Sequence, residues 1–231
     1  MKCVLIIGGV NDIGKSIARE FLKREYAVVV GYHNHLIKEE NIDYQKCDVT
    51  KEEDIKKIIE YCLNKYQRID ILLNLANINQ DNSFLDKTKE EFMNVLEVNL
   101  VGTFLLNQYY SRYIDNGMII NMASTDGIDT GSIFSIDYSA SKAGIITMSK
   151  IIANGTNNKV YCICPNWIDS ATTNSINHDY LVSELKRIKQ TRLITILELI
   201  DNLFQLIDGN YESGSVFRID VKDNQVWMKK I

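Results

Sequence analysis

The sequence has a single proline, Pro165, and it lacks repeats, low-complexity segments and any proline-rich linker that would divide it into units. Long hydrophobic runs are also absent. The first apolar run, residues 4–7, is too short for the apolar region of a signal peptide or for a membrane span. Since 231 residues suffice to bury a sizeable core, we expect one domain over residues 1–231, located in the cytoplasm.

Charge of one sign is never concentrated in a long block, and the net charge is only -4. A general surface for the phosphates of nucleic acid needs clustered basic residues. We therefore expect neither nucleic acid nor a membrane as a partner.

Cysteine is scarce and odd in number, with five residues in all. Cys162 and Cys164 alternate along one strand-like run, so they share a face where a direct disulfide is disfavoured. His33, His35 and His178 do not cluster with the cysteines at ligand spacing. The sequence therefore predicts buried, reduced thiols and no metal site.

What the sequence does contain is a regular alternation of apolar runs and helix-like segments. The runs rich in β-branched residues are 4–8, 27–32, 69–76, 118–123, 159–165 and 215–221. Amphipathic segments at 14–24, 51–66, 88–114, 138–153 and 195–208 separate most of them. This pattern predicts an α/β fold, a single doubly wound parallel sheet of the Rossmann type with helices on both faces.

In such a sheet, ligands bind beyond the carboxyl ends of the strands. A Tyr–Lys pair and a serine stand out as candidates for this edge of the sheet. Tyr138 and Lys142 in the stretch YSASK are four residues apart and share one face of a helix. Ser124 follows the apolar run 118–123, which delivers it to the same edge of the sheet. A nearby cation favours a phenolate, so this pair predicts a tyrosine acid or base.

Chance alone supplies about one such Tyr–Lys pair, and Tyr61 with Lys65 is a second. That second pair lies inside an amphipathic helix without a polar partner upstream, so we interpret it as a surface pair. The ordered set of GGVNDIG, CDV, LNLAN, VNLVG, NMAS, YSASK and CPNWI is much more specific. It resembles the short-chain dehydrogenase/reductase family over nearly the whole chain, and most closely the branch of 3-oxoacyl carrier-protein reductases.

The resemblance implies a catalytic group of Asn99, Ser124, Tyr138 and Lys142. In that family the tyrosine passes a proton to or from the substrate oxygen, and the serine hydrogen-bonds this oxygen. The lysine holds the nicotinamide ribose and lowers the pKa of the tyrosine, while the asparagine positions a water connected to the lysine. If Tyr138 were absent, Ser124 would be interpreted as a turn-capping serine. Without the resemblance, Asn99 is equally a buried amide that pins two helices.

The resemblance also implies a set of residues along the dinucleotide. The implied cofactor contacts are Gly8, Asn11, Asp12, Ile13, Tyr32, His33, Asp48, Val49, Asn74, Ala76, Tyr138, Lys142, Pro165, Ile168 and Ser170. Leu75 and Asn77 depart from the family pattern, which favours a structural role for Asn74. Asn166 is a further departure, since it stands where the family pattern has a glycine after the proline. Asp48 has the alternative role of a turn residue beside a helix.

Asp12 is the least expected residue, because it stands where the family pattern has a glycine in the phosphate-binding turn. As an N-cap it would support the turn while the Ile13 N–H meets the phosphate. Alternatively, its carboxylate competes for the same donors. We favour the first role, since the downstream motifs are intact.

Cofactor choice depends on the residues after the second strand, where a carboxylate favours NAD and basic donors favour NADP. Residues 32–35 offer Tyr32, His33, Asn34 and His35, several donors and no carboxylate. This favours NADP(H) over NAD(H) by about tenfold. His33 is otherwise an ordinary loop histidine. Only fifteen positions separate His33 from Asp48 in the sequence, which predicts that the helix following the second strand is shortened or lost.

The sequence therefore predicts an NAD(P)-dependent oxidoreductase that interconverts a carbonyl and a secondary alcohol, with a 3-oxoacyl thioester as one candidate substrate. The alternative is a dinucleotide-binding sensor or scaffold with weakened catalysis. A substrate lid is expected at about 170–192. The substrate is expected to be a small molecule, free or carrier-bound, and the protein a homodimer or homotetramer, although a short segment between Lys142 and Pro165 puts that assembly in doubt.

Overall fold

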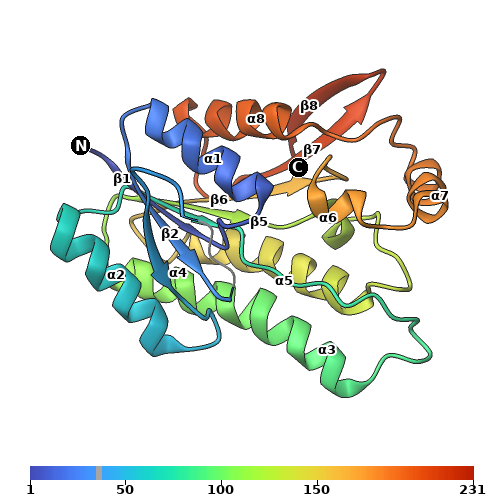
Figure 1. The fold of residues 1–231 in the computed structure, drawn as a ribbon, viewed down its shortest axis with the longest axis horizontal. Helices are drawn as coiled ribbons and strands as arrows, with labels where there is room; N and C mark the ends of the chain where they lie inside the picture. The colour runs from blue at the N-terminus through green and yellow to red at the C-terminus, as the bar shows by residue number, and fades with distance from the viewer. Residues whose placement is uncertain (35–37) are drawn as a thin grey trace.

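The computed structural model describes residues 1–34 and 38–231, and these form three layers with a sheet between two layers of helices (Figure 1). His35 lies outside the described residues. The described strands are β1 (Cys3–Ile7), β2 (Ala27–Tyr32), β3 (Asp43–Lys46), β4 (Ile71–Asn74), β5 (Met118–Met122), β6 (Lys159–Pro165), β7 (Val216–Lys222) and β8 (Gln225–Lys230).

The strand order is β3-β2-β1-β4-β5-β6-β7-β8, so the chain reverses its winding direction between β1 and β4. The strands from β3 to β7 are parallel, which confirms the predicted doubly wound arrangement. At one edge the sheet is not parallel, because β8, a strand that was not predicted, returns antiparallel to β7. A tight turn with two left-handed residues, Asp223 and Asn224, makes this hairpin.

Helices cover both faces of the sheet. They are α1 (Asp12–Lys23), α2 (Glu52–Tyr66), α3 (Lys89–Leu96), α4 (Gly102–Tyr113), α5 (Ile136–Ile152), α6 (Ala171–Asn174), α7 (His178–Ile188) and α8 (Ile196–Asp208). Figure 1 shows α1 and α8 on one face of the sheet and α2, α4 and α5 on the other. The expected segment 170–192 contains the short α6 and α7.

Each face of the sheet has its own apolar core. On one side, Ile17 and Phe21 of α1 pack with Leu203 and Phe204 of α8. On the other, α2 and α4 contribute buried residues that include Ile58, Ile59, Leu106 and Tyr110. All five residues of β1 are buried. A strand covered on both faces must be apolar at every position, which is why the central strands appear as continuous apolar runs.

The connection from β2 to β3 contains no helix in its described part, residues 33–34 and 38–42, in agreement with its length. The single helix expected at 88–114 is interrupted by a π-helical turn, η1 (Glu97–Val101), between α3 and α4. A π turn carries one extra residue, and such turns are common at functional sites. Asn99 lies in its middle.

The five cysteines are free and buried, as predicted. Cys162 and Cys164 have their sulfurs 4.0 Å apart on one face of β6. Residues 1–34 and 38–231 hold no group of three or more His, Cys, Asp or Glu residues placed for a metal ion. No helix in this same part of the chain has the length and apolar character needed to cross a membrane.

Candidate active site

Tyr138, Lys142 and Ser124 meet at the carboxyl end of the sheet. Tyr138 and Lys142 lie one turn apart on α5, and the Lys142 ammonium is 5.2 Å from the centre of the Tyr138 ring. Ser124 follows β5 and hydrogen-bonds Tyr138. Lys142 is buried and its Nζ donates to the backbone oxygen of Met122, 2.9 Å away. The structure thus brings together a phenol, a hydroxyl and a buried amine from two elements.

The pKa values at this cluster correct one expectation. Burial and then the charge of Asp126 raise the pKa of Tyr138, and the hydrogen bond with Ser124 opposes that shift only partly. Burial lowers the pKa of Lys142 to about 8. The predicted lowering of the Tyr138 pKa by Lys142 is therefore wrong for this arrangement, because burial disfavours the charged forms of both groups.

Asn99 is fully buried and its side-chain amide already has partners. Its Oδ1 accepts from the N–H of Ile78 at 2.8 Å, and its Nδ2 donates to the oxygen of Ile78 and to Ser141 Oγ. Ser141 Oγ in turn donates to the backbone oxygen of Tyr138. In this structure Asn99 therefore joins the segment after β4 to α5, which agrees with its structural role. The Ser141 hydroxyl alone separates its amide from the backbone oxygen of Tyr138.

Asp126 is a titratable neighbour of Tyr138 that sequence reasoning missed. It lies in the short helical turn η2 (Thr125–Gly127), where its N–H donates to Ser124 Oγ at 3.1 Å. Its Oδ1 accepts from the hydroxyl of Thr130 at 2.8 Å, and burial raises its pKa. Its position two residues after Ser124 was the signal that could have found it.

A buried ion pair beside Tyr138 was also missed. Lys87 Nζ lies 2.8 Å from Asp137 Oδ2, and both side chains are almost completely buried. Asp137 Oδ1 accepts from the N–H of Tyr138, and Lys87 Nζ also donates to the oxygen of Gln80. A lysine in a loop and an aspartate in a helix carry no pattern that would have paired them.

The turn after β1 has the shape of a phosphate-binding turn. Gly8 has φ of +79°, and a Cβ there would lie 2.7 Å from the N of Ala76, so this position requires glycine. Asn11 caps α1, since its Oδ1 accepts from the N–H of Gly14 at 2.8 Å. Asp12 instead accepts from the N–H of Ile13 with Oδ1 at 3.0 Å.

This geometry corrects the expected role of Asp12. Asn11, and not Asp12, is the N-cap, and the Asp12 carboxylate holds the very amide that was expected to meet the phosphate. The structure therefore agrees with the alternative role, in which the Asp12 carboxylate competes with the phosphate for the Ile13 N–H. The turn still fits a dinucleotide, because Gly8 lies close to the backbone of Leu75 and Ala76 after β4, and α1 begins at the end of the turn.

At the end of β2 the structure brings His33 to Asp48. His33 Nε2 lies 3.6 Å from Asp48 Oδ2, and Lys51 Nζ lies 3.2 Å from the same oxygen. Asp48 Oδ1 also accepts from the N–H and hydroxyl of Thr50, as a turn residue does. Tyr32 ends β2 here, half-buried. The segment 32–35 has no acid of its own, but Asp48 supplies one, and Lys51 adds a cation that was not predicted.

Asn74 at the end of β4 and Val49 after β3 have mainly structural contacts. Asn74 is buried, with Oδ1 accepting from the N–H of Ala76 and Nδ2 donating to Thr103 Oγ1. Val49 is buried against Gly102 of α4, where a Cβ would lie 2.7 Å from Val49 Cγ2. The structural interpretation of Asn74 therefore agrees with its bonds.

The segment after β6 lies next to the phosphate-binding turn. Pro165 ends β6, and Ile168 forms an isolated bridge with Ile194. Ser170 caps α6, its Oγ accepting from the N–H of Thr173 at 3.3 Å. The N–H of the following residue, Ala171, donates to Asp12 Oδ2 at 2.6 Å.

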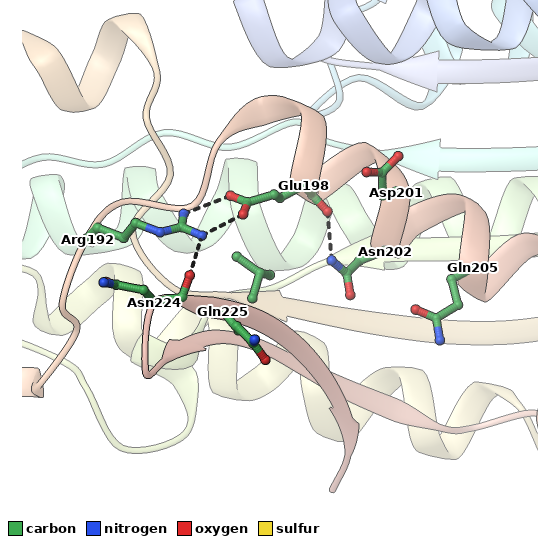
Figure 2. Close-up of a pocket in the computed structure, with 8 residues that line it drawn as sticks. Arg192, Glu198, Asp201, Asn202, Gln205, Asn224 and Gln225 are labelled. Carbon is green, nitrogen blue, oxygen red and sulfur yellow. Dashed lines mark hydrogen bonds and ion pairs between the residues drawn. The ribbon is translucent and has the colours of Figure 1, made fainter.

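A separate hollow of about 460 Å³ lies between α8 and the β7–β8 turn (Figure 2). In Figure 2, Arg192 faces Glu198, and its guanidinium bonds both Glu198 oxygens and the backbone oxygen of Asn224. The ion pair lowers the pKa of Glu198 to about 2. None of the predicted site residues lines this hollow, and its basic lining residue, Arg192, is already paired with Glu198, so it is not the candidate active site.

The chain is similar to known proteins over most of its length. The family model described as short chain dehydrogenase matches residues 2–181. The 3-oxoacyl-[acyl-carrier-protein] reductase FabG of Thermotoga maritima is 31% identical over 237 residues, covering 95% of this chain and 96% of that protein. Carbonyl reductase family member 4 of Xenopus laevis is 29% identical, with coverage of 95% and 96%.

Solved structures show the same fold. The ligand-free aldohexose dehydrogenase of Thermoplasma acidophilum has a TM-score of 0.83 at 21% identity, covering 94% of this chain and 91% of that one. ElxO with NADP bound has a TM-score of 0.79 at 27% identity, with coverage of 94% and 96%. The chain therefore belongs to the short-chain dehydrogenase family of NAD(P)-dependent oxidoreductases.

Proposed function

We propose that the protein interconverts a carbonyl and a secondary alcohol, with Tyr138 as the group that exchanges a proton with the substrate oxygen. The observation that carries this proposal is the meeting of Tyr138, Ser124 and buried Lys142 at the carboxyl edge of the sheet. A nicotinamide cofactor supplies hydride chemistry when bound.

The chain's own residues divide the remaining work. Reduction of a carbonyl builds negative charge on oxygen, and the hydroxyls of Tyr138 and Ser124 are the donors that stabilise it. The raised pKa of Tyr138 keeps its proton on the phenol, ready for donation in the reducing direction. Lys142 would hold the nicotinamide ribose from its buried position. Asp137, whose carboxylate accepts the Tyr138 N–H, fixes the start of α5 under the reacting groups.

The substrate that we propose is a 3-oxoacyl thioester, free or carrier-bound. Two relatives that cover 95% of the chain are named as 3-oxoacyl-[acyl-carrier-protein] reductases, which supports this choice. We propose α6 and α7 as the lid that excludes water during transfer. The lid carries Lys186 and Lys189 on its exposed side, which suits an anionic carrier.

For the cofactor we propose NADP(H), preferred over NAD(H) by about tenfold. His33 and Lys51 supply two basic groups near the expected 2′-phosphate, and ElxO, a structural relative, was solved with NADP bound. Asp48 opposes the preference, which is why it is modest. Titration with each cofactor tests this, and His33→Ala should weaken binding of NADPH but leave that of NADH nearly unchanged. Equal losses would remove His33 from the phosphate site.

The experiment for the reaction measures NADPH and NADH oxidation with 3-oxoacyl thioesters, ketones and sugars. Tyr138→Phe should lose at least about 10³-fold in turnover while still binding NADPH. The matched control is Tyr61→Phe, because Tyr61 and Lys65 form an exposed pair that is also four residues apart. Lys65 Nζ donates to the Tyr61 hydroxyl at 3.3 Å. Turnover that survives Tyr138→Phe would refute the mechanism.

A second candidate is a dinucleotide-binding sensor or scaffold with weakened catalysis. The contact between Asp12 and the Ile13 N–H favours it, because it occupies a phosphate donor. The completeness of the Ser124, Tyr138 and Lys142 cluster favours the enzyme. Tight cofactor binding by calorimetry with no turnover over the whole substrate panel would support the second candidate.

A further inference from the structure

The Asp12 carboxylate joins two parts of the cofactor site that are far apart in the sequence. Its Oδ1 accepts from the N–H of Ile13 at 3.0 Å, and its Oδ2 accepts from the N–H of Ala171 at 2.6 Å. Ala171 begins α6, the first helix of the proposed lid. Figure 1 shows the start of α1 beside α6. One side chain therefore bridges the phosphate-binding turn and the base of the lid.

The amides at the start of α1 are already occupied by protein acceptors. Ile13 donates to Asp12, Gly14 to the Asn11 side chain, and Lys15 to the Asn11 backbone oxygen. A carboxylate in the first turn also neutralises the positive end of the helix dipole, which is the feature that attracts a phosphate. An incoming pyrophosphate therefore meets a negative charge where it needs a donor.

We infer that Asp12 is an internal competitor of the cofactor pyrophosphate, and that it must leave the amides of Ile13 and Ala171 before the cofactor can bind. This inference rests on the proposed function. Asp12 is then the residue that sets cofactor affinity, and its departure unties α6 from α1. Binding of the dinucleotide and release of the lid base are one event.

The test compares the Kd of NADPH and of NADH for the wild-type protein, Asp12→Ala and Asp12→Asn, measured by fluorescence titration and calorimetry. Asp12→Ala should bind both cofactors about tenfold more tightly, and equally so, because the pyrophosphate is common to both. Asp12→Asn removes the charge but keeps an acceptor, so its gain should be smaller. Thermal unfolding establishes that each variant is folded.

The competing model, in which Asp12 supports the turn, gives the opposite sign. A Kd for Asp12→Ala that is unchanged or higher than that of the wild type overturns the inference. The matched control is Asp169→Asn, which removes a carboxylate two residues from Ala171 whose Oδ1 binds Asn174. This control should stay within about twofold of the wild type, because Asp169 holds neither amide.

Hydrogen exchange at the Ala171 amide gives a readout that needs no cofactor. Loss of its acceptor should speed exchange at Ala171 in Asp12→Ala, while Asp169→Asn leaves it unchanged; equal exchange in all three proteins contradicts the bridge. Failure of the wild type and all variants to bind either dinucleotide would refute the proposed function and this inference together. Binding by the wild type without a gain in Asp12→Ala would refute the inference alone.

Discussion

Lys142 is a buried amine whose charge is unfavourable to the folded state. Burial lowers its pKa from 10.5 to about 8, a difference worth about 3 kcal/mol. Between these two pH values the unfolded chain holds a proton that the folded chain has lost, so this group's contribution to stability improves as the pH rises from 8 towards 10.5.

Lys142→Met should therefore abolish turnover but raise the free energy of unfolding at pH 7, by about 1–3 kcal/mol after loss of the bond to Met122. Urea unfolding at pH 7 and near pH 10 measures this. The advantage of the variant should shrink at the higher pH, since wild-type Lys142 is neutral there. A variant that is less stable at both pH values would contradict the burial argument.

Asp126 offers a second prediction at a single residue. Its negative charge raises the pKa of Tyr138, so Asp126→Asn should lower that pKa. In the direction of alcohol oxidation, where Tyr138 must accept a proton, the rise of kcat with pH should move to lower pH by roughly one unit or less. The pH profile of kcat is the measurement.

The control for Asp126 is Asp129→Asn. Asp129 is an exposed carboxylate of the same loop that pairs with Arg218, and it is not among the main groups that shift the pKa of Tyr138. Its profile should match that of the wild type. An unshifted profile in Asp126→Asn, or a shift to higher pH, would show that Asp126 does not act on Tyr138.

Among elements, the connection from β4 to α3 is anchored by a buried ion pair in addition to its bonds with Asn99. Lys87 anchors this connection to Asp137 at the start of α5. Lys87→Met leaves the Asp137 charge buried without its partner, and it should cost roughly 3–5 kcal/mol of unfolding free energy. The double variant Lys87→Met/Asp137→Asn should recover part of this loss. Denaturant unfolding of the three proteins tests the pairing, and additive losses would argue against it.

Most elements could be predicted from the sequence because their signals are local. Continuous apolar runs mark the buried central strands, and the predicted run 159–165 coincides with β6. The edge strands β3 and β8 were not predicted. Their sequences, DYQK and QVWMKK, contain polar residues and are only partly buried. An edge strand needs no continuous apolar run, so its sequence carries a weaker signal.

In the candidate site, too, the residues with a local sequence signal could be predicted and the long-range contacts could not. Ser124, Tyr138 and Lys142 could be predicted because their spacing along helix and strand places them together. The contacts of Asp12 with Ala171 and of Lys87 with Asp137 join residues 159 and 50 positions apart. Tertiary packing alone creates such pairs. The prediction that Lys142 lowers the pKa of Tyr138 was wrong for a related reason. The burial that raises this pKa cannot be derived from the spacing of residues in the sequence.

For the whole molecule, we propose assembly into a homodimer or homotetramer through the outer helices. Each of α3, α4 and α5 exposes a large apolar side chain, namely Met93 (49% exposed), Phe104 (43%) and Ile151 (66%). Exposed apolar groups gathered on one layer favour association. Phe104→Glu should lower the mass measured by light scattering towards that of the monomer.

The control for assembly is Leu197→Glu on α8, a helix of the opposite layer where Leu197 is 73% exposed. This variant should keep the wild-type mass. A wild-type protein that is monomeric at micromolar concentration would overturn the proposal, and a dimer lost equally in both variants would place the interface elsewhere.

The π turn at Glu97–Val101 has a consequence for insertions and deletions. Val95 before it and Leu106 and Tyr110 after it all face the core, as does Asn99 within it. Removing one residue from this turn would restore an α-helix, but it would rotate everything on one side by about 100° about the axis. Either the apolar residues of α4 or the amide of Asn99 would then point away from the interior. We therefore expect that this segment tolerates neither the loss nor the gain of one residue, even where individual side chains can be exchanged.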